Sequence, residues 1–190
     1  MKLLFWLGCA AGCLSWCTPP VTAADPAEQV APVRLSEGRL QLMPPAAWTP
    51  RKPKFAGIVD YEFAVAAEEG DPGPGRVIVG GAGGGVEANL RRWLAQYRQP
   101  DGSPTEDRAK TSKKKVADCT VHVLDVSGTY QAPPFDPGGG GPRPNYRLLG
   151  AVIDAGQLGS YYVKFYGPAP TVARHEEAFA AMIDSLQKKN

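Results

Sequence analysis

The sequence predicts a single α+β domain in which a mainly antiparallel sheet is flanked by two main helices. Three observations predict this class. Several segments alternate between apolar and polar residues, as strands with one buried face do. Two further segments carry apolar residues at helical spacing. The elements follow one another in the order strands, helix, strands, helix, which is typical of an α+β chain.

Residues 1–24 have the pattern of an export signal. Lys2 supplies a positive charge, an apolar stretch runs from Leu3 to Trp16, and Pro19-Pro20 precede small residues that end at Ala24. A stretch of roughly 14 apolar residues is too short to span a bilayer, which needs about 20. We therefore expect cleavage after Ala23 or Ala24, and no membrane span in the mature protein.

Two alternatives to cleavage and release are open. The apolar stretch could stay as an uncleaved anchor, or a cysteine within it could be acylated. Cys13 fits acylation best because Ala10-Ala11-Gly12 precede it, whereas the triplets before Cys9 and Cys17 do not match a lipoprotein signal. The apolar run before Cys13 is unusually short, so the sequence favours a released periplasmic or secreted protein over a lipoprotein.

The composition limits the classes of partner and the sources of stability. Of the four cysteines, only Cys119 lies outside the signal, so the mature chain has no internal disulfide and depends on an apolar core. The formal net charge is only +2, and acidic neighbours offset the lysines between Lys110 and Lys115. This near-neutral charge argues against nucleic acid as a partner. We expect a monomer.

Residues 25–33 are polar and contain two prolines, which predicts a flexible leader before a domain spanning 34–190. A first strand is expected over 39–43. Residues 59–65 alternate cleanly, and 76–79 follow the Gly/Pro turn of 70–75, so these two segments predict a hairpin.

The next segment changes period and predicts a helix that ends before Gln99-Pro100. Its apolar stripe consists of Val86, Leu90, Trp93, Leu94 and Tyr97. A charged loop or solvated hairpin then leads to strands over 116–126, 146–153 and 159–166, of which the last two form a hairpin. A closing helix begins near Thr171, and its apolar face consists of Val172, Phe179, Met182, Ile183 and Leu186.

The segment from Gln131 to Asn145 separates two of these strands and is rich in glycine and proline. Its consecutive glycines, 138–141, lose much conformational entropy on ordering, and its prolines interrupt a strand ladder. The sequence therefore predicts a mobile surface loop.

No catalytic, cofactor or metal site is predicted. The glycine run 80–85 lies between a strand and a helix, but it lacks the Lys-Ser/Thr pair of a phosphate loop. His122 and Asp125 point to opposite faces of a strand, so they do not form a local triad. Cys119 shares a face with Val121 and Val123, which predicts a buried, unreactive thiol.

One face of the sheet is a candidate for binding a partner. Tyr162, Lys164 and Tyr166 alternate with the apolar residues of their strand and point away from the predicted core. A face that combines aromatic rings with both signs of charge suits a polar partner. Simple solvation of this face, or its coverage by the Gly/Pro segment, are the alternatives.

The arrangement resembles the PsbP-like fold, a group that also includes DcrB-like bacterial envelope proteins. The resemblance covers about 34–188 and depends on the order of elements and a few apolar anchors, without a specific motif. These anchors are Pro44, Trp48, the helix after Gly85, the strand 161–165, and Phe179, Met182, Ile183 and Ser185 in the last helix. It implies an antiparallel sheet flanked by helices, and binding or assembly roles without enzymatic activity. It transfers no functional residues.

Taken with the export signal, this resemblance predicts a non-enzymatic binding or assembly accessory protein of the bacterial cell envelope. Its partner is an unknown protein or polar ligand of the envelope. The alternative is an envelope hydrolase or other enzyme whose site is assembled from distant residues, for which His122, Tyr162 and Lys164 are the candidates.

Overall fold

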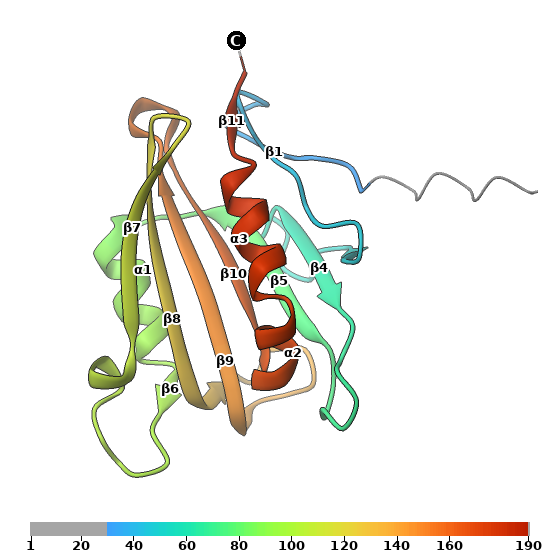
Figure 1. Cartoon of the computed structure of the whole chain (residues 1–190), viewed down its shortest axis with the longest axis vertical. Helices are drawn as coiled ribbons and strands as arrows, with labels where there is room; N and C mark the ends of the chain where they lie inside the picture. The colour runs from blue at the N-terminus through green and yellow to red at the C-terminus, as the bar shows by residue number, and fades with distance from the viewer. Residues whose placement is uncertain (1–29, 190) are drawn as a thin grey trace, which may run out of the picture.

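A large antiparallel sheet forms the centre of the computed structural model, which describes residues 30–189 (Figure 1). Along the sheet the strands lie in the order β3, β4, β5, β10, β9, β8 and β6, and β7 also pairs with β8. The bounds are β3 Thr49–Arg51, β4 Tyr61–Val65, β5 Gly75–Gly81, β6 Tyr97–Arg98, β7 Lys110–Val116, β8 Cys119–Ala132, β9 Gly141–Asp154 and β10 Ser160–Pro168. The hairpins predicted for β4–β5 and β9–β10 are confirmed.

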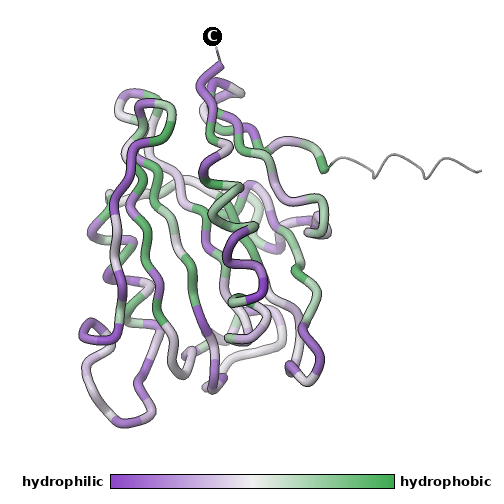
Figure 2. Tube along the Cα trace, viewed as in Figure 1, coloured by the Kyte–Doolittle hydropathy of each residue, from purple (hydrophilic) through white to green (hydrophobic). Residues whose placement is uncertain are grey.

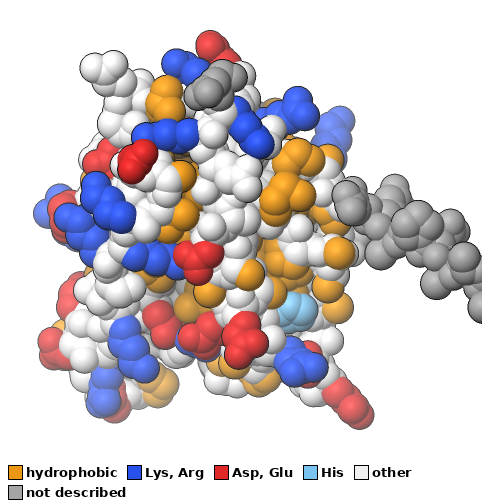
Figure 3. Space-filling view, turned by 45° about the horizontal axis from the view of Figure 1, so that its top comes forward, with side chains coloured by type: hydrophobic (Ala, Val, Ile, Leu, Met, Phe, Trp, Pro, Cys, Tyr) orange, Lys and Arg blue, Asp and Glu red, His pale blue; other side chains and the backbone are white. Residues whose placement is uncertain are grey.

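The segment of 110–116, expected as a charged loop or solvated hairpin, is the edge strand β7. A two-residue turn at Ala117 and Asp118 joins it to β8, and both residues have the left-handed φ angles, 47° and 59°, that suit the twist of a tight hairpin. The strand is hydrophilic along much of its length (Figure 2), and Lys and Arg side chains gather on this side of the surface (Figure 3). Lysines on an edge strand oppose pairing with other chains.

Three helices cover the two faces of the sheet. Helix α1, Gly85–Leu94, follows β5 through Gly84 and Gly85, whose positive φ angles allow the sharp turn into the helix. It covers one face, while α2, Ala169–Arg174, and α3, Glu176–Asp184, cover the other (Figure 1). The predicted stripe is therefore helical up to Leu94, and Tyr97 belongs to β6. The predicted closing helix is divided at His175.

The face under α3 carries an apolar core, which we call the apolar face. Trp48, Phe165 and Phe179 lie in contact at its centre, with ring centroids 5.6 to 6.3 Å apart. A small second sheet, β1 Val33–Leu35, β2 Leu40–Leu42 and β11 Gln187–Lys188, adds further buried side chains to this core. Two 3₁₀ turns, Thr105–Arg108 and Gly156–Leu158, complete the elements.

The predicted class, one α+β domain with an antiparallel sheet and flanking helices, is confirmed. The predicted signal, residues 1–24, lies outside the described residues, as does most of the leader predicted over 25–33. Within 30–189, none of the helices has the length and apolar character needed to cross a membrane.

Candidate functional site

Tyr162, Lys164 and Tyr166 lie on the predicted face, opposite Val163 and Phe165, but that face is interior rather than surface. Their exposed fractions are 9%, 5% and 3%. The expectation of an exposed face is wrong because α1 packs on it beside Tyr162. The alternative of coverage by the Gly/Pro segment holds at Tyr166, whose hydroxyl bonds to Asp136 of that segment. Trp93 of α1 lies edge-on to Tyr162, with ring centroids 6.3 Å apart, and it lies so close to Gly150 that a Cβ there would be 2.5 Å from its ring. We call this second face the tyrosine face.

Lys164 is the buried cation of the tyrosine face. Its Nζ donates a hydrogen bond to Gln96 Oε1 at 2.6 Å and lies 4.7 Å from the ring centroid of Tyr166. Burial lowers the pKa of Lys164 to about 7, Asp136 opposes this change, and Arg76 adds to it. The hydroxyl of Tyr162 donates to the carbonyl oxygen of Ile58 at 3.1 Å.

A chain of hydrogen bonds crosses three neighbouring strands at the end of this face. Arg76 donates to both carboxylate oxygens of Glu62, at 2.8 and 2.9 Å, and to the Tyr166 hydroxyl at 2.6 Å. That hydroxyl in turn donates to Asp136 Oδ1 at 2.7 Å. The four residues of this hydrogen-bond chain therefore satisfy one another instead of facing water. The hydroxyl of Tyr97, buried on the same face, has no hydrogen-bond partner among the described residues.

Asp136 comes from the Gly/Pro segment that was expected to be a mobile surface loop over 131–145. Strands β8 and β9 extend into this segment, and the loop between them is only 133–140. The Asp136 side chain is 5% exposed and forms ion pairs with Arg143 at 2.8 Å and Arg76 at 3.6 Å. The Tyr130 hydroxyl donates to it at 3.5 Å. The loop therefore docks onto the sheet, because its carboxylate is held by cations and hydroxyls of the strands.

The environment holds most of these groups in their ordinary charge states at neutral pH. The hydrogen bond from Arg76 lowers the pKa of Glu62. Burial works against the charge of Arg76 and Arg143, but their carboxylate partners outweigh it and raise the pKa of both guanidinium groups. Burial raises the pKa of the Tyr166 hydroxyl, which therefore stays protonated.

A groove of about 850 Å³ opens beside this network, between the turn before β5 and the loop of 133–140. We call it the arginine groove. Its charged lining residues are Arg51, Lys52, Glu62, Arg76, Asp136 and Arg143, and its apolar walls include prolines 72, 74, 137, 142 and 144. Arg51 and Lys52 are exposed, and within 30–189 neither forms an ion pair.

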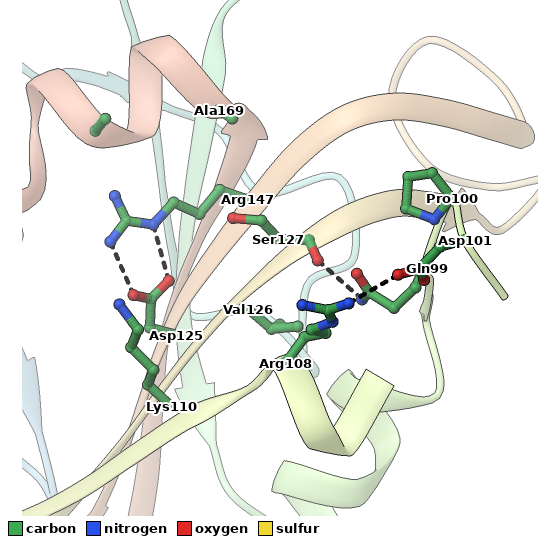
Figure 4. A pocket seen from close by; sticks show the side chains of 11 residues that line it. Gln99, Pro100, Asp101, Arg108, Lys110, Asp125, Val126, Ser127, Arg147 and Ala169 are labelled. Carbon is green, nitrogen blue, oxygen red and sulfur yellow. Dashed lines mark hydrogen bonds and ion pairs between the residues drawn. The ribbon is translucent and has the colours of Figure 1, made fainter. Parts of the chain in front are cut away.

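A second groove, of about 780 Å³, lies on the other side of the sheet near α2 (Figure 4). Arg147 donates to both oxygens of Asp125, at 2.8 and 2.9 Å, and also pairs with Glu176 at 2.8 Å. Across the groove, Arg108 pairs with Asp101 at 2.8 Å. These charges pair with one another. Lys110, which also lines the second groove, is exposed and forms no ion pair among the described residues, so this groove has one unpaired cation where the arginine groove has two.

Among the residues considered for an enzyme, Tyr162 and Lys164 share one face of β10, and His122 lies in register with Tyr162 across β9. In the described part of the chain no hydrogen bond joins His122 to either of them. His122 lines neither of these grooves, nor a third of about 300 Å³ between β7 and α3. Cys119 is fully buried on the apolar face, as predicted, and its Sγ contacts the carbonyl oxygen of Ala117 at 3.6 Å. Within the described part of the chain, no cluster of three or more His, Cys, Asp or Glu side chains is arranged to hold a metal ion.

Sequence reasoning missed the ionic network. Alternation places Glu62 and Arg76 on one face of adjacent strands, which is the only signal for their pairing. Asp136 and Arg143 are the two charged residues of an otherwise uncharged Gly/Pro segment. That contrast could have identified them as a pair that fastens the loop.

Comparisons with known proteins bear on the fold. No protein-family model matches the chain, and no curated protein sequence matches it. The solution structure of cyanobacterial PsbP (CyanoP) from Synechocystis sp. PCC 6803 is similar, with a TM-score of 0.50 and 12% identity over 94% of this chain and 100% of that one. This likeness confirms the expected PsbP-like fold.

Two further solved structures show weaker similarity. PA94 from Pseudomonas aeruginosa, described as a protein of unknown function and putative regulator, has a TM-score of 0.46 and 15% identity, over 84% of this chain and 97% of that one. LpqN, described as involved in cell envelope biogenesis of Mycobacterium tuberculosis, has a TM-score of 0.46 and 11% identity, over 84% and 90%.

Proposed function

We propose that this chain is an exported, non-enzymatic binding or assembly accessory protein of the bacterial cell envelope, and that the arginine groove binds a negatively charged group of its partner. One observation carries the binding site. Arg51 and Lys52 line the groove without an ion-pair partner among the described residues, whereas the other four charged lining groups pair with one another. The groove therefore presents unbalanced positive charge to an anion.

The floor of the arginine groove supports a binding role. Arg76 and Tyr166 lie on adjacent paired strands and hydrogen-bond to each other. Their positions are set by the sheet, so a ligand would meet donors that are already ordered, and less side-chain entropy would be lost on binding. Their hydrogen bond fixes the shape of the groove floor and activates no nucleophile, which supports a non-enzymatic role.

Support for export comes from residues 1–24, with their charged start, short apolar stretch and small residues before Asp25. Expression of the full chain in a bacterial host and intact-mass analysis of the periplasmic fraction test this part. A mass that begins at Ala24 or Asp25 is expected. A protein that stays in the cytoplasm with residues 1–24 attached, or a fatty-acylated Cys13 in the membrane fraction, would contradict a released protein.

Binding is tested with two simple anions, succinate and inorganic phosphate, titrated into the protein and followed by NMR shifts of backbone amides. We expect shifts around the arginine groove that saturate and weaken with added salt. Exchanging Arg51 and Lys52 for glutamine should weaken binding by about tenfold, the effect of losing roughly 1.4 kcal/mol.

The matched control exchanges Lys113 and Lys115 of β7 for glutamine, which changes the net charge equally at a distant, exposed edge. This variant should bind as the unaltered protein does. Equal loss in both double variants would mean that only net charge matters, and an absence of saturable shifts in the groove would overturn the proposal.

A further inference from the structure

The loop of 133–140 places its own carboxylate where an anion of the arginine groove would bind. Asp136 Oδ1 accepts hydrogen bonds from Tyr166 at 2.7 Å and Tyr130 at 3.5 Å, and Oδ2 accepts one from Arg143 at 2.8 Å. Arg76 approaches the same carboxylate to 3.6 Å. Two guanidinium groups and two hydroxyls thus converge on one pair of oxygens. We call this set of four donors the carboxylate site.

The four donors do not belong to the loop that brings the carboxylate. Arg76, Tyr130, Arg143 and Tyr166 lie on β5, β8, β9 and β10, each within a paired stretch of its strand. If the loop moved away, the sheet would keep these donors in place. The site is therefore preformed, and Asp136 is a removable occupant of it.

The loop itself is suited to movement. Its ends are fixed where Ala132 pairs with Gly141, and between them Gly138 and Gly139 have φ angles of 88° and 84°, which glycine adopts without strain. Apart from those of Asp136, its contacts lie at the surface. Lys54 donates to the carbonyl oxygen of Phe135 at 3.3 Å, and Arg143 donates to those of Pro137 and Gly139. The ring of Phe135 lies edge-on to Phe55, with centroids 5.6 Å apart.

The balance of charge favours an anion at this position. The network contains two guanidinium cations, Arg76 and Arg143, and two carboxylates, Glu62 and Asp136. Without Asp136 one positive charge would be left without a partner and poorly solvated, which is costly in a buried site. The site therefore requires a negative charge, and the Asp136 carboxylate can leave it only when another anion takes its place.

From this geometry we infer that Asp136 is an internal stand-in for a carboxylate of the ligand, which enters past Arg51 and Lys52, takes over the donors of Tyr166 and Arg143, and displaces the loop of 133–140. This inference rests on the proposed function of the groove. The ligand class is a carboxylate because the site presents donors to two oxygens of a planar group. The tethered Asp136 competes at a high effective concentration, so the resting protein binds free carboxylates weakly.

The test compares the full protein with its Asp136→Asn variant, in which the side chain keeps its size and loses its charge. Succinate and inorganic phosphate are titrated separately and followed by NMR. We expect the variant to bind succinate at least tenfold more tightly than the unaltered protein, and phosphate to gain less. Asp118→Asn, at the exposed β7–β8 turn, is the control for net charge and should leave the affinity unchanged.

A second measurement uses the unaltered protein and does not depend on the folding of a variant. Saturating succinate should accelerate hydrogen exchange of the amides of 133–141, because the loop is displaced, while the amides of β10 stay protected. Succinate binding that depends on Arg51 and Lys52, but leaves both loop exchange and the Asp136→Asn affinity unchanged, would overturn this inference and leave the proposed function standing. If neither anion binds either protein, both proposals fail.

Discussion

The two faces of the main sheet bury side chains of different kinds. On the apolar face, under α3, aliphatic side chains and the rings of Trp48, Phe165 and Phe179 fill the space. On the tyrosine face, under α1, the space contains hydroxyls, a lysine and the end of an ionic network. Hydrophobic burial, which has no directional requirement, stabilises the apolar face. The tyrosine face also buries polar groups that need hydrogen-bond partners, and among those described the Tyr97 hydroxyl lacks one.

Both faces stabilise the fold, but only the tyrosine face also carries polar groups that could serve a ligand. One apolar side chain in a core can be replaced by another of similar volume. A buried carboxylate such as Asp136 neutralises the cations around it, so only another anion can take its place. The tyrosine face reaches the arginine groove through Tyr166 and Arg76, which line the groove and also form part of the network. A site at the edge of a buried polar network thus obtains ordered donors from the fold itself.

The largest expected effect comes from truncating the central ring on each face. Phe179→Ala and Trp93→Ala should each lower the free energy of unfolding by about 3 to 5 kcal/mol, because both rings are buried, at 3% and 5% exposure. Urea denaturation measures both. A cost below about 1 kcal/mol for Trp93→Ala would contradict a packed core on the tyrosine face, since α1 would then contribute little to stability.

A smaller effect tests how closely α1 packs. Gly150→Ala would bring a Cβ to 2.5 Å from the ring of Trp93, so the helix must shift, and overpacking of this kind costs about 1 to 3 kcal/mol. Gly81→Ala is the matched control, because a Cβ there meets no atom within 4 Å. Equal stability of the two variants by urea denaturation would mean that the helix is not seated on the tyrosine face.

The elements with a regular hydrophobic pattern could be predicted from the sequence. Strand β4 and helix α1 were found because their periods of two and 3.6 are clean over the buried residues. For Lys110–Val116 the sequence left a charged loop and a solvated hairpin open, because the segment has almost no apolar face. The structure has the hairpin, in which β7 forms as an edge by pairing with β8. Strand β11 contains two exposed residues, and no local sequence pattern predicts that they pair with β2.

The burial of the tyrosine face could not be predicted in the same way. Alternation assigns Tyr162, Lys164 and Tyr166 to one face but does not show whether a helix lies on it. That depends on where α1 packs, and Gly150 decides this by leaving room for Trp93. The candidate site was missed for the same reason, since Asp136 and Arg76 are 60 residues apart and meet only in the folded sheet.

The buried lysine makes the tyrosine face sensitive to pH. Because burial lowers the pKa of Lys164 to about 7, the unfolded chain binds more protons than the folded one between about pH 7 and 10. The free energy of unfolding should therefore rise with pH in this window, by at most about 1.4 kcal/mol per unit from this group. Below pH 7, Lys164 is protonated in both states and adds no slope.

Urea denaturation between pH 7 and 9.5 measures this slope. Lys164→Met should flatten it, because the side chain no longer titrates while the groups around it, Asp136, Arg76, Tyr130 and Tyr166, are unchanged. Lys113→Met is the control, since Lys113 is exposed on β7. An unchanged slope in Lys164→Met would show that the lysine reaches water in the folded protein.

The smallest expected effect concerns Cys119 on the apolar face. Its reactivity measures whether the edge of that face excludes solvent as well as the centre does. Its thiol is fully buried, and this burial raises its pKa, so little reactive thiolate is present at neutral pH. Cys119→Ala should lower the free energy of unfolding by on the order of 1 kcal/mol, the loss of one small buried group.

Labelling with iodoacetamide should be slow in the folded protein and fast in urea. Mass analysis of the peptide that contains Cys119 measures both rates. Rapid labelling without urea would mean that β7 and β8 open readily at this end, and that the apolar face is closed only where α3 covers it.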